Sequence, residues 1–112
     1  MATTPKSLVN GVNLTNAAAT YYTATGVRAV ITKATFVNDD ATPVTVTINI
    51  VASGGSATYA NRITKEKTLA AGETWSCYDL VGHELESGGF ISMLASVTAK
   101  IGCRISGYEV TI

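Results

Sequence analysis

The sequence predicts an all-β protein: one two-sheet β-sandwich of about eight to nine strands, jelly-roll-like or immunoglobulin-like in topology, with at most one or two helical turns. Thr, Val and Ile number 17, 11 and 8 among 112 residues, and these β-branched side chains fit a pleated sheet better than a helix. Short apolar segments recur between turn signals, many of them supplied by ten glycines. A chain of this length accommodates one domain, which we expect at residues 7–112, after a flexible N-terminal arm at residues 1–6.

Alternation and turn residues predict the strands in the first half of the chain. Asn10-Gly11 is a strong hairpin signal, because both central residues of the tight turn take a positive φ, and it would join Lys6–Val9 to Val12–Thr15. Three further strands are expected, at Thr20–Thr25, Arg28–Asn38 and Val44–Ile50. The last has the cleanest period of two, with all four of its Val and Ile side chains at even positions on one face.

The second half predicts four more strands, at Ala57–Thr68, Thr74–Tyr78, Phe90–Ser96 and Val97–Ser106. Asp79 suits a helix N-cap, so a helical turn is expected at Asp79–Glu86. In the last strand the odd-numbered side chains from Val97 to Ile105 would face inward, with Lys100 and Arg104 facing out. After Ser106-Gly107 the apolar residues are Tyr108, Val110 and Ile112, and this change of parity predicts a β-bulge at the glycine.

The strand at Arg28–Asn38 has apolar side chains on both of its faces. Strict alternation places Val30, Ala34 and Phe36 on one face and Ala29, Ile31 and Val37 on the other. The core of a two-layer fold covers only one of these faces, so the other must be covered by a loop, a terminal arm or a partner. We therefore expect an interface formed by Ala29, Ile31 and Val37, with the opposite face as the alternative, and with Thr3 and Thr4 of the arm ordered against a neighbour.

Charge and composition narrow the possible partners. Eight Lys and Arg balance eight Asp and Glu, which argues against nucleic acid and against an anionic membrane surface, since both attract a cationic face. Charged residues are 14% of the chain, against about 25% in an average soluble domain, which suggests that part of the surface is covered by other protein. No secretory signal is recognisable in Met1–Lys6, so we expect synthesis in a cytoplasm. Cys77 and Cys103 would then be reduced and buried, with a disulfide between neighbouring strands as the alternative.

Catalytic and metal-binding patterns are weak. His83 is the only histidine, and it could be grouped with Asp79 or Glu84 and with a nearby serine, but no Gly-x-Ser-x-Gly elbow accompanies it. We expect a loop histidine and no enzymatic activity. The two cysteines are 26 positions apart without a Cys-x-x-Cys pair, so we expect no metal, no cofactor and no small-molecule substrate. Trp75 is expected to pack in the core, with a carbohydrate-stacking role as the alternative.

Several segments of the chain resemble small β-sandwich structural proteins of tailed bacteriophages. The resemblance is carried by the opening Leu8–Tyr22 and the strand Arg28–Asn38, and by the segments Gly72–Cys77, Leu80–Leu85, Ser87–Ser92, Ala95-Ser96 and Ile105–Glu109. It implies a non-enzymatic viral protein located in the virion. Within that group it favours a capsid decoration protein, also called a cement protein, which binds the outer capsid surface. Its partners would be itself, as a trimer or dimer, and the major capsid protein.

Three other functions remain open at this point. A tail, neck or fibre-associated module would share the same fold and composition. A carbohydrate-binding module would need exposed aromatic side chains, for which Tyr21, Tyr22 and Tyr59 are the candidates. A hydrolase would need His83 in a pocket.

Overall fold

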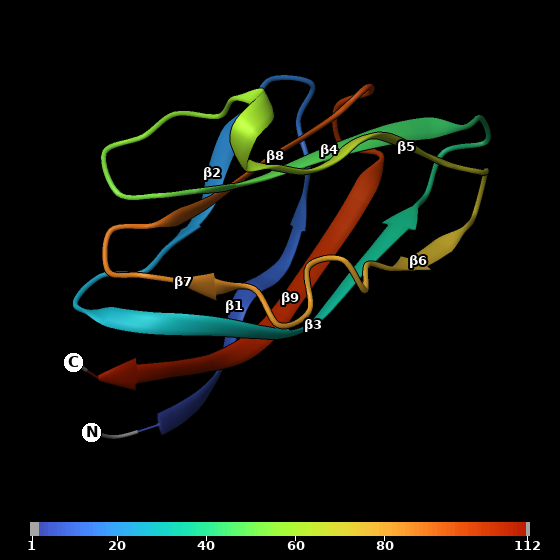
Figure 1. Cartoon of the computed structure of the whole chain (residues 1–112). Coiled ribbons are helices and arrows are strands. Elements are labelled where there is room, and N and C mark those ends of the chain that lie inside the picture. The colour runs from blue at the N-terminus through green and yellow to red at the C-terminus, as the bar shows by residue number, and fades with distance from the viewer. Residues whose placement is uncertain (1–2, 112) are drawn as a thin grey trace.

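Two antiparallel sheets face each other in the computed structural model, which describes residues 3–111 (Figure 1). Sheet A has the strand order β1-β9-β3-β6, and the short β7 also pairs with β3. Its strands are β1 (Thr3–Asn13), β3 (Val27–Asn38), β6 (Thr74–Ser76), β7 (Glu84–Leu85) and β9 (Ile101–Thr111). Sheet B has the order β2-β8-β4-β5, with strands β2 (Ala19–Thr23), β4 (Val44–Val51), β5 (Arg62–Leu69) and β8 (Phe90–Ala95). The predicted all-β two-sheet sandwich is confirmed, with nine strands among the described residues.

The pairing is nested. β1 pairs with β9, β2 with β8, β3 with β6 and β7, and β4 with β5. This nested pairing arises when a long antiparallel hairpin folds over on itself. It gives two sheets with four strand positions each, which is the arrangement of a jelly roll. Of the two topologies that the sequence left open, the structure therefore has the jelly-roll order, with β6 and β7 sharing one strand position.

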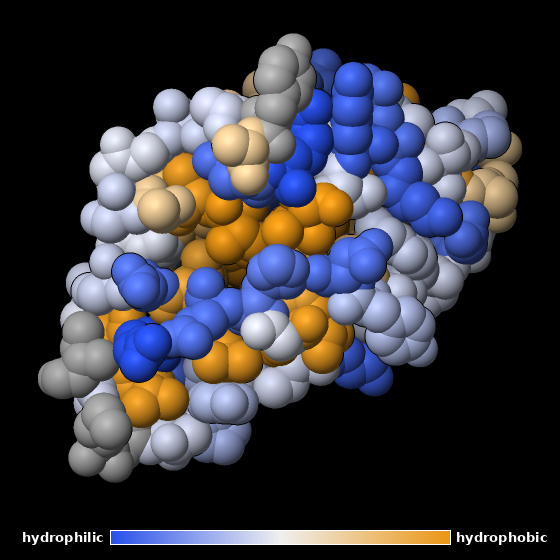
Figure 2. All heavy atoms as spheres, viewed as in Figure 1, coloured by the Kyte–Doolittle hydropathy of each residue, from blue (hydrophilic) through white to orange (hydrophobic). Residues whose placement is uncertain are grey.

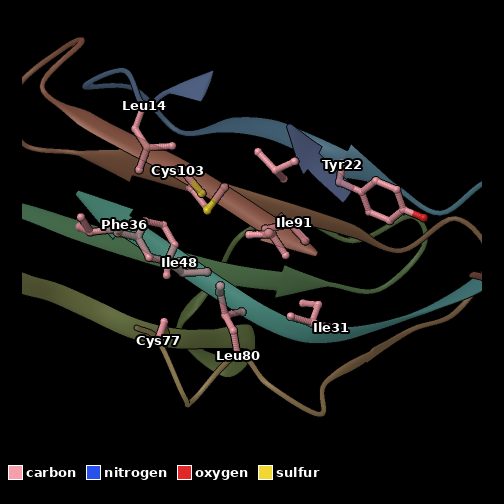
Figure 3. Close-up of a cluster of buried hydrophobic side chains, with 14 of the residues drawn as sticks. Leu14, Tyr22, Ile31, Phe36, Ile48, Cys77, Leu80, Ile91 and Cys103 are labelled. Atoms are coloured by element: carbon pink, nitrogen blue, oxygen red, sulfur yellow. The ribbon is translucent and has the colours of Figure 1, made fainter. Parts of the chain in front are cut away.

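The core lies between the sheets and is filled by aliphatic side chains from both (Figure 3). Val44, Val46 and Ile48 of β4 are fully buried, as their alternation predicts. From sheet A, Phe36 and Ile31 are also fully buried, and the Phe36 ring packs on Trp75 with ring centroids 5.3 Å apart. Cys77 and Cys103 are free thiols buried in this core, as expected.

The predicted hairpin at Asn10-Gly11 is wrong. All of β1 is one strand along β9, and the register shifts between Val9 and Val12, where Gly11 has a φ of 67°. The same positive φ that suits a tight turn here forms a β-bulge within an edge strand. The ladder to β9 also extends back to Thr3, so Thr3–Lys6 form part of β1 and the structure differs from the predicted arm boundary at residue 6. Residues 1 and 2 of that arm lie outside the described residues.

A bulge in β3 reverses which side chains face the core. Ile31 lies opposite Gly107 and Lys33 opposite Ser106, so Thr32 is an extra residue in the β3 ladder. Ala29 and Ile31 face inward before this bulge, and Ala34 and Phe36 face inward after it. The core-facing apolar residues are therefore odd-numbered before Thr32 and even-numbered after it, and all of them lie on the same side of the sheet. The prediction of two separate apolar faces is wrong for this reason.

In β9 the core-facing positions stay odd-numbered along the whole strand, whereas the sequence predicted a change to even-numbered positions after Gly107. Ile101, Cys103, Ile105 and Gly107 are buried in turn, and Glu109 continues that side by bonding to Tyr22 of sheet B. Tyr108 and Val110 therefore lie on the side turned away from sheet B, while Ile112 is outside the described residues. Gly107 is needed because the backbone of β3 approaches it closely, and it does not form a bulge in β9. A Cβ at this position would lie 2.0 Å from the Val30 carbonyl oxygen.

The helical content is one short 3-10 turn, η1 (Tyr59–Asn61), in the part of the chain that the structure describes. The predicted strand at Ala57–Thr68 accordingly starts later, as β5. The predicted helical turn at Asp79–Glu86 is wrong: Tyr78–Gly82 form consecutive turns, and Glu84–Leu85 are strand β7. The Gly82 N–H and the His83 carbonyl bond to the backbone of Ile31, so pairing with β3 replaces a helix here.

Candidate functional surface

The outer face of sheet A, meaning the side turned away from sheet B, contains a hollow. Figure 1 shows this sheet with β2, β8, β4 and β5 all on its other side. The hollow has a volume of about 620 Å³ and crosses β1, β9 and β3. Its lining includes Val12 and Asn13 from β1, Gly102, Arg104 and Ser106 from β9, and Lys33, Thr35 and Val37 from β3.

Register explains why the sheet is hollowed at this place. Val37 and Asn13 both lie opposite Gly102, and Thr35 lies opposite Arg104. A Cβ at Gly102 would meet only the Asn13 side chain within 4 Å, at 3.9 Å, so the missing side chain leaves open space on the sheet. At Gly11 the Arg104 guanidinium occupies the corresponding space, with Nη2 3.3 Å from where a Cβ would stand.

The other half of the outer face is more apolar. Tyr108 lies opposite both Val30 and Pro5, and Val110 lies opposite both Arg28 and Thr3. Val30, Tyr108 and Val110 are half-buried within the single chain, and we call these three residues the apolar row. Arg28 and Glu84 form an ion pair beside the row.

The structure separates the five predicted interface residues. Ala29 and Ile31 are fully buried in the core, so they are not available to a partner. Val37 is half-buried and lines the hollow on the outer face. Thr3 and Thr4 are exposed on β1, and their opposite partners place Thr3 on the outer face beside Val110 and Thr4 on the inner side beside Glu109. Val30 belongs to the face that the sequence left as the alternative, whereas Arg104, Lys33, Tyr108 and Val110 were not predicted as surface contacts, since their grouping depends on the strand register.

At the end of the sandwich near β2, three polar side chains connect the sheets. Tyr22 donates a 2.5 Å hydrogen bond to Glu109 Oε2, and Lys6 Nζ lies 3.3 Å from the same oxygen. Hydrogen bonding from Tyr22, and then the nearby Lys6, lower the pKa of Glu109. Burial, together with the hydrogen bond to Glu109 and its charge, raises the pKa of Tyr22. These shifts favour a neutral tyrosine and an ionised carboxylate.

Among the described residues, the His83 side chain makes no hydrogen bond or ion pair with Asp79, Glu84 or a serine, and Glu84 pairs with Arg28 instead. His83 is exposed on the turn before β7, where its backbone bonds to Leu80 and Ile31. Within residues 3–111 no cluster of three or more His, Cys, Asp or Glu side chains has the geometry to hold a metal ion. Burial raises the pKa of Cys103 to about 12 and also raises that of Cys77.

Of the tyrosines named for carbohydrate binding, Tyr21 and Tyr22 do not form an exposed platform. Tyr22 is buried, and Tyr21 is half-buried with its hydroxyl accepting a hydrogen bond from the Thr15 N–H. The side chain of Tyr59 lies outside the described residues. Trp75 packs on Phe36 as expected, and Lys67 Nζ lies 5.7 Å from the Trp75 ring centroid. Tyr78, which the sequence analysis did not single out for binding, is 81% exposed.

A second hollow, of about 320 Å³, lies where the end of β4 faces β7. Ile50, Val51 and Leu85 line it, with Arg28, Glu84 and Glu86 contributing charge. Figure 2 shows, in the view of Figure 1, hydrophobic residues at the surface between two bands of hydrophilic residues. Among residues 3–111, no helix has the length and hydrophobicity needed to cross a membrane.

Comparison with known proteins returned no matching protein-family model, no similar curated protein and no similar solved structure.

Proposed function

We propose that this protein is a non-enzymatic structural component of a tailed-phage virion, and specifically a capsid decoration protein that binds the outer capsid surface. The segments that resemble phage β-sandwich proteins support the virion assignment, together with zero net charge and a low content of charged residues. The protein is made in the host cytoplasm and joins the particle there.

The observation that carries the proposal is the outer face of sheet A. The apolar row, Val30, Tyr108 and Val110, is only half-buried within one chain, and it adjoins the 620 Å³ hollow on the same sheet. A face with both features can contact two kinds of neighbour at once. We assign the apolar row to contact between copies in a homo-oligomer, a trimer or dimer, and the remainder to the major capsid protein. An obligate contact of this kind buries well over about 1,000 Å² in total.

The test is reconstitution. Purified protein is added to capsids of the encoding phage from which it is missing, and the particles are imaged by electron microscopy. The proposal expects added density at symmetry-related positions on the outer capsid surface. Density at the tail or neck alone would favour the tail-module alternative, and particles without added density would contradict both.

A further inference from the structure

Two cations in the hollow on sheet A, Lys33 and Arg104, have no acidic partner within residues 3–111. Among the described residues, the ion pairs are Lys6 with Glu109 and Arg28 with Glu84. Arg104 and Lys33 are exposed and belong to neither pair. The one carboxylate lining the hollow is Asp39, which follows β3 beyond Val37, so the hollow carries a net positive charge in a neutral chain.

The spacing of these cations is set by the β3–β9 register. Arg104 lies opposite Thr35, and Lys33 is two residues away on the same side of β3. The Cβ atoms of such diagonal positions on one face of a sheet are about 7–8 Å apart. Alternate side chains of an extended peptide leave its backbone about 6.6 Å apart, so a Glu-x-Glu pattern starts near this spacing, and its flexible side chains must spread to reach the Arg104 guanidinium over β1.

The shape of the hollow also suits an extended chain. Gly102 has no side chain and Ser106 a small one, so little projects from the sheet at these positions. The guanidinium of Arg104 lies over Gly11 of β1. An arginine guanidinium can present two N–H groups to one carboxylate in a bidentate geometry. Thr35 and Ser106 add hydroxyl groups between the two cations.

We propose that this hollow binds an extended acidic segment of a partner protein, with carboxylates at alternate positions pairing with Arg104 and Lys33. The inference deepens the proposed function, on which it rests, by specifying the chemistry of the capsid segment that is bound. A second copy of this chain is a poorer occupant, because stacking two such faces about a two-fold axis brings Arg104 and Lys33 of each copy toward like charges. Asp39 at the far end repels carboxylates and so disfavours acidic residues of the bound segment at that end.

The test uses the peptide acetyl-Thr-Glu-Thr-Glu-Thr-amide and the full-length protein labelled for NMR. We expect saturable shifts at amides of the hollow in β1, β9 and β3, with a Kd on the order of 1 mM. Arg104→Gln and Lys33→Gln should each weaken binding about tenfold, which is the effect of losing one charge-assisted contact. The control Lys65→Gln, on the exposed part of β5 in the other sheet, should leave binding unchanged.

Several results would overturn the inference. These are equal binding of the peptide with Gln in place of Glu, equal binding of free glutarate, shifts that map outside the hollow, or no saturable shift. Particle binding is measured separately. If the Arg104→Gln protein no longer binds the peptide but still binds particles, the hollow is not part of the contact with the capsid, and the proposed function stands. Wild-type protein that binds the peptide but no particle would contradict the proposed function alone.

Discussion

The hydroxyl of Tyr22 in β2 and the carboxylate of Glu109 in β9 join the two sheets through a 2.5 Å hydrogen bond. Tyr22 is buried, and Glu109 also lies 3.3 Å from Lys6 Nζ. Both ends of the chain therefore meet at this bond, since Lys6 is in β1 and Glu109 is near the end of β9. It fixes the sheets to each other beyond the contacts of the apolar core.

Tyr22→Phe should lower the free energy of unfolding by about 1–2 kcal/mol, because a buried hydrogen bond to a charged group is lost while the ring is kept. Tyr21→Phe is the matched control. Its hydroxyl only accepts a bond from the Thr15 N–H, so a smaller loss is expected. Urea unfolding of the three proteins at neutral pH measures the difference, and equal stabilities of the two variants would contradict the role given to Glu109.

The stability advantage of wild type over Tyr22→Phe should depend on pH at both ends of the range. The pKa of Glu109 is lowered from 4.5 in the folded state, so its contribution is present above that value and is lost as pH falls through the folded pKa. The pKa of Tyr22 is raised from 10.0, so its contribution is complete below that value and is lost as pH rises through the folded pKa. Unfolding curves from acid to alkaline pH should show a plateau between these limits, and a constant difference would contradict this account.

Lysine substitutions at adjacent positions of β3 should have opposite outcomes. Ile31→Lys places an ammonium in the core where the side chain is fully buried, and it should unfold the protein. Val30→Lys adds a charge to the half-buried apolar row, and it should give a folded monomer. Circular dichroism and analytical ultracentrifugation measure the two results. Wild type that is already monomeric at micromolar concentration would contradict the contact assigned to the row.

Glycine at position 107 should be far less replaceable than glycine at position 102 in the same strand. A Cβ at residue 107 would lie 2.0 Å from the Val30 carbonyl oxygen, so Gly107→Ala must displace the β3 backbone and should cost more than about 3 kcal/mol. Gly102→Ala meets nothing closer than 3.9 Å and should change stability by less than about 0.5 kcal/mol. Thermal unfolding of both variants tests this, and similar melting temperatures would show that the close approach is wrong.

Both cysteine thiols should resist alkylation in the native protein. Burial raises the pKa of Cys103 to about 12 and raises that of Cys77, and the thiolate is the form that reacts. Iodoacetamide at mildly alkaline pH should modify neither residue until denaturant is added, as read by mass spectrometry. Rapid modification of folded protein at either site would contradict the burial of these thiols.

Uninterrupted alternation of apolar residues could be predicted from sequence, and bulges could not. Val44, Val46 and Ile48 of β4 are buried as their alternate positions predict, whereas Ile50 is only half-buried and Val51 beside it is buried. In β3 the odd-numbered apolar residues change to even-numbered ones across Thr32-Lys33, and a bulge there was not considered. The two adjacent polar residues at this break are the signal that could have revealed it. Asn10-Gly11 shows a related limit, because a positive φ serves a hairpin turn and a strand bulge equally well.

The candidate surface depends on register, which sequence patterns do not determine. Arg104 was expected to face outward, and it does. Its diagonal position relative to Lys33 follows from the extra residue at Thr32, which moves Lys33 to the outer face. The same residue places Ala29 and Ile31 in the core and so removes them from the predicted interface. Long-range pairing of strands far apart in sequence thus decides which side chains meet on the surface.

The most direct test of the account is the copy number of this protein in purified particles of the phage that encodes it. Virions are banded by density, stripped of loosely bound protein by salt washing, and quantified by mass spectrometry against the major capsid protein. A decoration protein should remain with the particles in a fixed, symmetry-compatible ratio to the major capsid protein. A ratio of only a few copies per particle would indicate a tail or neck component, and absence from washed particles would contradict a structural role in the virion.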